Sequence, residues 1–498
     1  MKNRTNILLL TLIIFFLKFN FSFSNEIFNF DVTEIEIKEK GNRFLGKNGG
    51  KAKSLDGTTI TANNFDYDKL KNILIATENV KIYDPKKNVI IYSDEITYFK
   101  NNELIITNGN SKAIDKEVEI DARNFEYNKL KNTIYAQGDV KINNKKDKYL
   151  IYSDEITYFK NNELIITNGN SKAIDKEVEI DARNFEYNKL KNTIYAQGDV
   201  KINNKKDKYL IYSDEITYFK NNELIITNGN SKAIDKEVEI DARNFEYNKL
   251  KNTIYAQGDV KINNKKDKYL IYSDEITYNK LKGKILTKSN SKAISDGIII
   301  DADIFKYDEQ NNILIAEGDV TVDDKIEDYK LETEYLTYNK KFNKIFTKGE
   351  TYALIENKYE FKSKNVFLNR NKKELKSNNY STIKDDEANF YRLSKFLYFY
   401  EKKFLKGNDV EVDTNYKNEK NDKLYFKDAF INFSDNSFIA KDTKINLHKK
   451  IFDSERELVE SDTNLFDGEN DPRIFGSTSS GNEDIVVLNK GIFTSCKK

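Results

Sequence analysis

Apolar and polar residues alternate in short runs along most of the chain. Val178, Ile180 and Ala182 occupy every second position, and Ile194 and Ala196 do so again after a polar stretch. Alternation with a period of two predicts strands with one buried face, whereas no run shows the 3.6-residue period of an amphipathic helix. The pattern therefore predicts an all-β protein.

Turn residues and changes of phase separate these runs. Phe185 and Tyr187 fall in the opposite phase to the run before them. Because side chains alternate strictly along a strand, a change of phase needs a bend or bulge, which we place at 183–184. The polar stretch 188–192 predicts a turn, and Gly198 predicts a second bend. Each unit is expected to hold about three short strands.

The pattern recurs because the sequence itself repeats. Residues 91–150 are repeated letter for letter at 151–210 and at 211–270. Each copy consists of two related halves with a mean period of about thirty residues, and weaker versions extend from about residue 45 to 450. A period of this length indicates a repeat architecture, in which each unit buries its apolar face only against its neighbours.

Stacked units of this kind predict two sheets that face one another with Ile, Val and Ala between them. Interior units all have the same neighbours, so added copies lengthen the array without disturbing it. The unpaired strand edges at both ends offer pairing sites for another protein. A recent tandem duplication, or an error in assembling repetitive DNA, also explains the copies and leaves the predicted fold unchanged.

The N-terminus has the composition of a secretory signal peptide. Lys2 and Arg4 precede an apolar run at 7–17, and a small-x-small site follows at 22–24. The apolar run is short for a membrane span of about 20 residues. We therefore expect export and cleavage of a signal peptide over residues 1–24, with an uncleaved anchor as the alternative.

Composition excludes several function classes. The chain has 82 Lys and Arg residues against 81 Asp and Glu residues. It therefore lacks the basic excess that would indicate binding to nucleic acid. Histidine occurs only as His448 and cysteine only as Cys496, which argues against a zinc site, His-based catalysis and an internal disulfide. Asp154 and Glu155 recur in each copy among Lys and Asn residues, which favours a solvated strand edge over acid–base catalysis. We expect no enzyme, no metal and no cofactor.

The half-repeat resembles the OstA-like domain. The matching pattern is I-x-A-x-x-F-x-Y, a turn, and A-x-G-D-V-x-I, at 180–187 and 196–202 and in the other copies. That domain occurs in the lipopolysaccharide-transport proteins of Gram-negative bacteria, namely the periplasmic bridge protein LptA and the N-terminal part of the outer-membrane assembly protein, the LptD/OstA family. The resemblance is good over residues 45–320 and weak from there to 450.

The C-terminal tail resembles the join between periplasmic domain and barrel in the outer-membrane assembly protein. The similar segments are N-D-P-R-x-x-G at 470–476 and F-T-S-C at 493–496. By this resemblance the barrel is missing from the chain, and Cys496 would be one half of a disulfide with it. The alternative is a lone thiol without consequence.

The resemblance implies an elongated OstA-like β-jellyroll of folded-over antiparallel sheets. Its apolar trough would hold lipopolysaccharide acyl chains, while sugars and phosphates stay outside. Burial of each acyl CH₂ group would contribute about 0.8 kcal/mol to binding. The expected domains are a signal peptide (1–24), a repeat domain (25–450) and a join to the barrel (451–498). The residues expected to line the trough are Ile120, Ala122, Ile134, Val140, Ile142, Ile180, Ala182, Ile194, Val200, Ile202, Ile240, Ile254, Val260 and Ile262.

The partners implied are lipopolysaccharide, the bridge protein through edge-to-edge strand pairing, and the outer-membrane barrel with its partner lipoprotein. The expected location is the periplasm at the outer membrane, and no nucleic acid is expected. Lys-rich turns such as 203–208 are interpreted as solubilising turns, with lipid phosphates as the alternative ligand. The alternative function is a secreted structural β-repeat, a spacer or surface fibre without lipid cargo.

Overall fold

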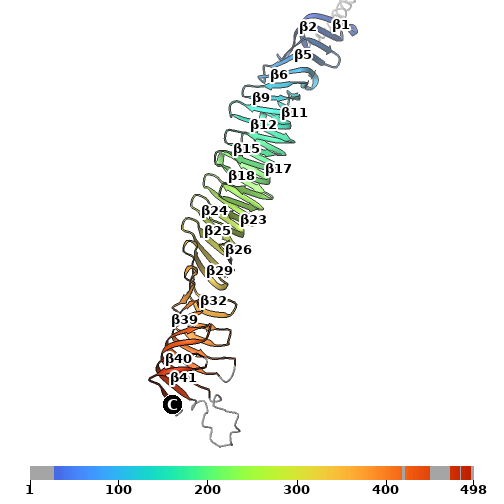
Figure 1. Ribbon diagram of the computed structural model, residues 1–498. Coiled ribbons are helices and arrows are strands. Elements are labelled where there is room, and N and C mark those ends of the chain that lie inside the picture. Colours follow the sequence, from blue (N-terminus) through green and yellow to red (C-terminus); the bar gives the residue numbers. More distant parts are fainter. Residues whose placement is uncertain (1–26, 418–420, 449–471, 483, 495–498) are drawn as a thin grey trace, which may run out of the picture. The chain divides into compact units, whose positions relative to one another are not determined.

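The computed structural model describes residues 27–417, 421–448, 472–482 and 484–494. In these ranges the chain is built of β-strands, so the all-β prediction is confirmed. The chain divides into two compact units, Met1–Gly198 and Asp199–Lys498. Within each unit the strands follow one another in chain order (Figure 1). Within the described ranges, no helix has the length and apolar character needed to cross a membrane.

The first unit holds the strands β1 (Phe28–Lys38), β2 (Arg43–Ser54), β3 (Thr59–Ala62), β4 (Asn64–Asp68), β5 (Ile73–Asp84), β6 (Val89–Phe99), β7 (Leu104–Asn108), β8 (Ser111–Ile114), β9 (Val118–Ala122), β10 (Asn124–Asn128), β11 (Thr133–Asn144), β12 (Tyr149–Phe159), β13 (Leu164–Asn168), β14 (Ser171–Ile174), β15 (Val178–Ala182) and β16 (Asn184–Asn188). The boundary between the units falls inside β17 (Thr193–Asn204).

The second unit holds the strands β18 (Tyr209–Phe219), β19 (Leu224–Asn228), β20 (Ser231–Ile234), β21 (Val238–Ala242), β22 (Asn244–Asn248), β23 (Thr253–Asn264), β24 (Tyr269–Asn279), β25 (Lys284–Lys288), β26 (Ser291–Ser295), β27 (Ile298–Ala302), β28 (Ile304–Asp308), β29 (Ile313–Asp324), β30 (Tyr329–Asn339), β31 (Lys344–Thr347), β32 (Glu350–Ile355), β33 (Tyr359–Lys364), β34 (Phe367–Asn369), β35 (Glu374–Ser377), β36 (Ser381–Lys384), β37 (Phe390–Leu393), β38 (Lys395–Phe399), β39 (Phe404–Asp413), β40 (Lys423–Asn432), β41 (Ser437–Asn446), β42 (Arg473–Gly481), β43 (Val486–Asn489) and β44 (Ile492–Thr494).

Single-turn 3₁₀ helices occupy some of the connections. They are η1 (Glu39–Gly41), η2 (Lys100–Asn102), η3 (Lys160–Asn162), η4 (Lys220–Asn222), η5 (Lys340–Phe342) and η6 (Arg370–Lys372).

The long strands each belong to two ladders. β11 pairs along its length with β12 on one side, while on its other side its first half pairs with β10 and its second half with β9. Ala136 therefore lies opposite Phe125, whereas Ile142 lies opposite Ile120. β12 is shared between β13 and β14 in the same way. The sheet is thus folded over along a line through the middle of the long strands, which gives two facing layers and a jellyroll architecture.

A glycine bulge bends β11 and its equivalents β17, β23 and β29. In β11 the register shifts at the bulge, where Gly138 has φ 83° and Asp139 has φ 51°. A side chain at Gly138 would place its Cβ 2.9 Å from Cβ of Arg123. Both the positive φ and this close approach therefore require glycine at the position. The bend predicted at Gly198 is confirmed, with φ 81°. The Gly-Asp pair of the repeat is therefore a folding signal.

The short strands bend differently. Arg183 separates β15 from β16 and donates its backbone N–H to the carbonyl oxygen of Gly198 at 2.9 Å, which confirms the bend predicted at 183–184. The alternation restarts after this residue, so Phe185 and Tyr187 face inward with exposed fractions of 2% and 7%. The interior therefore contains aromatic rings in addition to the predicted Ile, Val and Ala side chains.

The inward tyrosines meet in pairs. The rings of Tyr149 and Tyr187 pack edge to face with centroids 5.4 Å apart, and Tyr209 and Tyr247 repeat this contact at 5.4 Å in the second unit. The Tyr149 hydroxyl accepts a hydrogen bond from Asn144 Nδ2 at 3.2 Å. Burial raises the pKa of Tyr187 and of Tyr247 to about 12. These rings fill the space between the layers and remain neutral.

A row of buried hydroxyls follows the line along which the sheet folds. Ser171 Oγ donates to Thr167 Oγ1 at 2.6 Å and lies 3.1 Å from Ser153 Oγ. Thr167 Oγ1 in turn accepts the backbone N–H of Phe185 at 2.8 Å. Each hydroxyl is buried and hydrogen-bonded, so the row carries no unpaired polar group and fixes where the sheet turns.

Candidate functional site

The residues predicted to line the trough lie between the two layers. All have exposed fractions of 9% or less except Ala122, which is half-buried at the end of β9. In the first unit Ile142 lies opposite both Ile120 and Ile151. In the second unit Ile262 lies opposite Ile240 and Ile271. One layer of each unit thus presents a row of isoleucines to the interior.

The other layer adds tyrosines to the predicted isoleucines. Ile134 lies between Tyr127 and Tyr158 in the first unit. Ile254 lies between its equivalents Tyr247 and Tyr278 in the second. The interior is apolar at every one of these positions but is lined by mixed aliphatic and aromatic rows.

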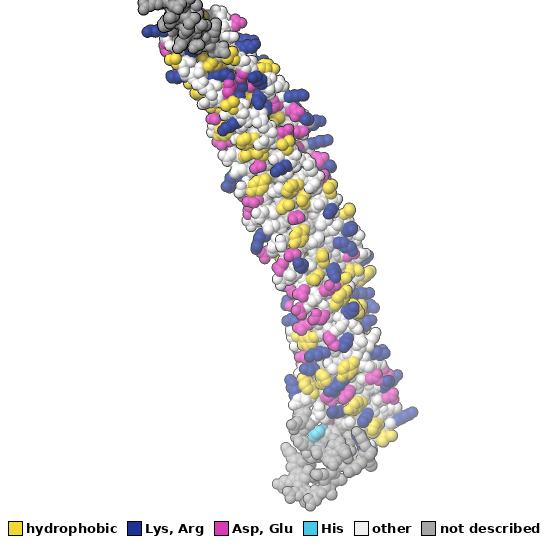
Figure 2. Space-filling view, turned by 180° about the vertical axis from the view of Figure 1, so that it is seen from behind, with side chains coloured by type: hydrophobic (Ala, Val, Ile, Leu, Met, Phe, Trp, Pro, Cys, Tyr) yellow, Lys and Arg dark blue, Asp and Glu magenta, His cyan; other side chains and the backbone are white. Residues whose placement is uncertain are grey.

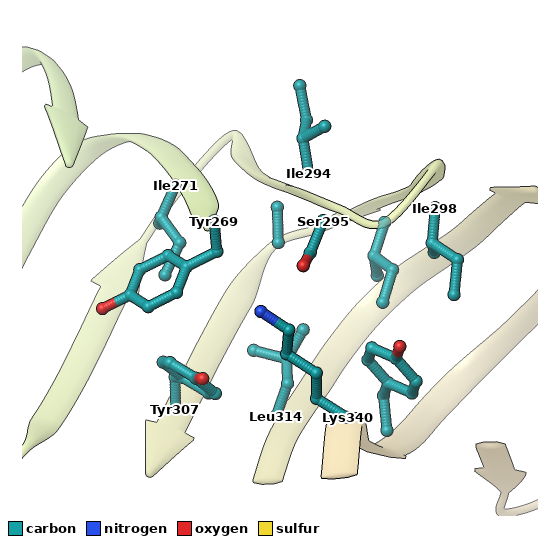
Figure 3. Close-up of a pocket in the computed structure, with 11 residues that line it drawn as sticks. Tyr269, Ile271, Ile294, Ser295, Ile298, Tyr307, Leu314 and Lys340 are labelled. Carbon is teal, nitrogen blue, oxygen red and sulfur yellow. The ribbon is translucent and has the colours of Figure 1, made fainter. Parts of the chain in front are cut away.

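The interior of the second unit is closely packed beside Lys280 and Lys340. One cavity of ≈ 20 Å³ is lined by Tyr209, Ile211, Ala233, Ile234, Asp235, Val238, Ile240, Tyr247, Ile254, Tyr278 and Lys280. Another of ≈ 30 Å³ is lined by Tyr269, Ile271, Ala293, Ile294, Ser295, Ile298, Ile300, Tyr307, Leu314, Tyr338 and Lys340 (Figure 3). Each has room for about one or two water molecules. An acyl chain would therefore need the layers to separate.

The first unit is wider at its N-terminal strands. A cavity of ≈ 300 Å³ is lined by Ile27, Phe28, Asn29, Phe30, Ile35, Phe44, Tyr67 and Lys69. Half of its lining residues are aromatic, and Phe30 stacks on Phe44 with centroids 6.2 Å apart. This cavity is large enough for several CH₂ groups, in contrast to the two cavities beside Lys280 and Lys340 in the second unit.

The turns at the strand ends of one layer meet those of the other layer along a line that we call the seam. In the first unit it is formed by the turns 100–103, 129–132, 160–163 and 189–192 of one layer and 55–58, 84–88, 115–117 and 145–148 of the other. In the second unit it is formed by the turns 249–252, 280–283, 309–312, 340–343, 370–373 and 400–403 of one layer and 205–208, 235–237, 265–268, 296–297, 324–328 and 356–358 of the other.

Lysines of one layer reach carboxylates of the other across the seam of the first unit. Lys129 Nζ lies 2.7 Å from Asp56 Oδ2 and donates to Thr58 Oγ1 at 2.6 Å. Lys160 Nζ lies 3.0 Å from Asp115 Oδ2. These charged groups are largely buried, with Lys129 only 8% exposed. The pairing therefore holds the two edges together where solvent screening is weak.

The second unit repeats this arrangement. Lys280 pairs with Asp235, and Lys403 Nζ lies 2.9 Å from Glu356 Oε2. Arg370 Nε lies 2.7 Å from Asp324 Oδ2. These ion pairs join the two layers through side chains, whereas the backbone hydrogen bonds of the ladders run within each layer.

Burial and pairing shift the ionisation of the seam residues. Burial raises the pKa of Asp56, but hydrogen bonds from Lys129 and its other donors lower it by more, so the pKa lies well below its usual range. Burial lowers the pKa of Lys129, but its carboxylate partners outweigh this effect and the pKa is raised. The pKa of Asp235 is lowered, since the hydrogen bond from Lys280 and those from the backbone outweigh its burial. The seam is a row of fixed charges near neutral pH.

The face of the described residues seen in Figure 2 shows no concentration of one charge. Figure 2 shows Lys and Arg side chains interspersed with Asp and Glu, with small apolar patches between them. Within the described part of the chain, no group of three or more His, Cys, Asp or Glu side chains has an arrangement that could hold a metal ion.

Several predicted features lie outside the described residues. These are the signal peptide over 1–24, residues 451–471 of the predicted join, which include Asn470 and Asp471, and Ser495 and Cys496 near its end. The described part of the tail forms β42, which pairs with β41, placing Ile474 opposite Ile445. β43 and β44 pair with β42 in turn. The tail strands thus continue the antiparallel ladder of the repeat region.

The ion pairs of the seam were not predicted from the sequence. The lysine that begins the turn 189–192 and the aspartate of the turn 145–148 look like ordinary solubilising residues. The available signal was their strict recurrence, since each copy places a lysine and an aspartate at the same two turn positions. Only the folded-over sheet brings these turns together.

Comparison with known proteins gives a family for the repeat region. Residues 179–284 match the family model described as "LptA/(LptD N-terminal domain) LPS transport protein". A crystal structure of LptH, the LptA homologous periplasmic component of the lipopolysaccharide transport device of Pseudomonas aeruginosa, matches at 15% identity with a TM-score of 0.22, over 23% of this chain and 84% of that one. No curated protein matches the chain. The chain therefore carries, over residues 179–284, an OstA-like domain related to LptA and to the N-terminal domain of LptD.

Proposed function

We propose that this protein is a periplasmic lipopolysaccharide-transport module, which carries acyl chains along its apolar interior toward the outer-membrane assembly site. The match of residues 179–284 to a lipopolysaccharide-transport family carries this proposal. The predicted signal peptide and the inward rows of isoleucine and alanine in each unit support it. The residues expected to contact lipid are the predicted lining residues, together with tyrosines such as Tyr187 and Tyr247.

The energetics favour a repeated conduit over a single site. Each acyl CH₂ moved from water into the interior contributes about 0.8 kcal/mol, which offsets the separation of the two layers. Every identical copy within residues 91–270 presents the same lining, as Ile142 and Ile262 illustrate, so no position along these copies holds the acyl chains more tightly than the next. A lipid can then move from copy to copy without meeting a deep energy well.

The strand edges supply the proposed partner contacts. In the described residues β1 pairs only with β2, and Ile35 and Ile37 on β1 are 47% and 59% exposed. At the other end Ile492 and Phe493 on β44 are 64% and 62% exposed. We propose that the β1 edge receives the bridge protein by strand pairing, and that the C-terminal strands face the outer-membrane barrel and its lipoprotein.

The second candidate is a structural spacer without lipid cargo. The close packing between the layers favours it, because cavities of ≈ 20 and ≈ 30 Å³ hold no acyl chain. The family match does not favour a spacer, since the matched family is described as a lipopolysaccharide-transport protein.

Deletion of one copy separates the two functions. Removing residues 211–270 joins Leu210 to Ile271, which restores the same junction sequence. We expect the shortened protein to fold and to bind fewer molecules of purified lipopolysaccharide per chain at saturation, as measured by native mass spectrometry. A spacer would bind none in either form, and that result would refute the transport proposal.

A further inference from the structure

We propose that the seam of the second unit is a lateral entry for an anionic amphiphile, and that Lys280 and Lys340 take the headgroup phosphates while the acyl chains enter the interior beneath them. The inference rests on the proposed function and adds to it the route of entry and the residues that recognise the headgroup. It places the polar part of the lipid along one defined line of the molecule.

The two small cavities described above each combine an apolar floor with one lysine. The cavity beside Lys280 has Ile211, Ile240 and Ile254 among its lining residues. The cavity beside Lys340 is lined by aliphatic and tyrosine side chains, and the Lys340 nitrogen points into the space next to Tyr269 (Figure 3). A single cation above an apolar cavity matches a molecule with one anionic head and a hydrocarbon tail.

The seam can part without breaking either ladder. Lys280 is held by Asp235, and Lys340 contacts the carbonyl oxygen of Asp267 and lies 3.8 Å from Asp296 Oδ2. These are side-chain contacts, so moving the turns apart leaves the strand pairing of each layer intact. A phosphate carries more charge and more acceptor oxygens than one carboxylate, so it competes for the same ammonium.

Lysine suits an exchange of partners better than arginine does. Its ammonium is a compact charge on a flexible stem, which can follow an incoming anion. Arg370, by contrast, is 8% exposed and paired at 2.7 Å with Asp324, whose side chain is 0% exposed. We infer that the seam opens along the lysine turns and stays closed at Arg370.

One acidic position divides the proposed entry. Glu309 occupies the position equivalent to Lys249 in the next copy and accepts hydrogen bonds from Asn264 Nδ2 at 3.1 Å and Tyr278 at 3.2 Å. A carboxylate there repels a phosphate, so the proposed headgroup positions are Lys280 and Lys340 and exclude the turn at 309–312.

The first test compares two variants that each remove two lysine charges from the same turns. One variant removes the lysines that face the seam, and the other removes lysines that are exposed. The seam variant carries Lys280→Gln and Lys340→Gln, and the control carries Lys282→Gln and Lys341→Gln, which remove two exposed charges from the same turns. The ligands are purified lipid A with its phosphates and the same lipid after phosphatase treatment. We expect the seam variant to bind phosphorylated lipid A about tenfold more weakly, with binding of the dephosphorylated form unchanged.

Two results would overturn the inference, and a third would refute the proposed function as well. Equal weakening by the seam and control variants, or equal weakening for both lipids, would show that Lys280 and Lys340 do not recognise the phosphate. Failure of the unmodified protein to bind either lipid would refute the proposed function itself.

A second test does not depend on the glutamine variants folding. Lys280 and Asp235, which pair across the seam, are replaced by cysteine in a Cys496→Ser background and joined with a bifunctional maleimide after folding. We expect the joined protein to load lipid A at least tenfold more slowly than the same protein treated with a monofunctional maleimide. Equal loading rates would exclude lateral entry at this part of the seam.

Discussion

Lys249 Nζ lies 3.5 Å from Asp207 Oδ2, although the two residues occupy turns at the ends of different layers. Lys189 makes the same contact with Asp147 at 3.4 Å in the preceding copy. The recurrence follows from the identical sequence, since equal strands bring equal turns together. Each copy therefore adds an ion pair to the seam as well as apolar side chains to the interior.

The Asp56–Lys129 pair should make stability depend on pH at both extremes. Because the pKa of Asp56 is depressed on folding, its contribution is present above the unfolded value of about 3.9 and is lost as the pH falls through the folded value. Because the pKa of Lys129 is raised, its contribution is present below about 10.4 and is lost as the pH rises through the folded value.

We expect Asp56→Asn to lower the free energy of unfolding by about 1–3 kcal/mol near neutral pH, with a smaller effect at pH 2–3 and above pH 11. Urea denaturation of both proteins across this range measures the difference. A difference that stays constant from pH 2 to pH 12 would show that the ion pair contributes nothing.

Gly258 should tolerate no side chain. It has φ 81°, and an added Cβ would lie 2.8 Å from Cβ of Arg243. We expect Gly258→Ala to destabilise the protein by about 2–4 kcal/mol, from backbone strain and the clash together. Gly349→Ala is the control, because Gly349 has φ 90° and nothing lies within 4 Å of its added Cβ. Equal losses in the two variants, measured by thermal or urea unfolding, would mean that the clash is relieved at no cost.

Equivalent core positions should respond equally. Ile142 and Ile262 have 0% exposure and lie opposite isoleucines on both sides. Ile142→Ala and Ile262→Ala should each lower the free energy of unfolding by about 2–5 kcal/mol and agree within about 0.5 kcal/mol. Urea unfolding followed by tyrosine fluorescence tests this. Values more than about 1.5 kcal/mol apart would show that the copies are packed differently.

The inward tyrosines should ionise only when the layers separate. Burial raises the pKa of Tyr187 and Tyr247 to about 12, against about 10 in the unfolded chain. Their contribution to stability is therefore complete below pH 10 and is lost as the pH rises toward 12. Tyrosinate absorbance should show a late fraction that appears together with loss of the β-sheet circular dichroism signal. A Tyr187→Phe, Tyr247→Phe variant should reduce that fraction, and an unchanged late fraction would contradict the assignment.

Alternation and turn chemistry are enough to predict the strands and the bends. A bend is predicted at Gly198 because glycine interrupts a β-rich run, and its positive φ is the physical reason. The predicted lining omits Tyr187 because its phase is counted from the strand before Arg183, where the alternation restarts. The pairing of Lys189 with Asp147 could not be predicted, since no local rule says which free edges of a folded sheet meet. The close packing of the interior depends on ring orientations that the pattern of residues does not specify.

The most direct test of the account places a photo-crosslinking amino acid at Ile262 in the interior and, separately, at exposed Lys251 in the neighbouring turn. After irradiation with purified lipopolysaccharide, crosslinked lipid is quantified by immunoblot for each protein. The account predicts strong labelling at Ile262 and little at Lys251, because the acyl chains lie between the layers. Labelling at Ile262 no greater than at Lys251 would contradict transport through the interior.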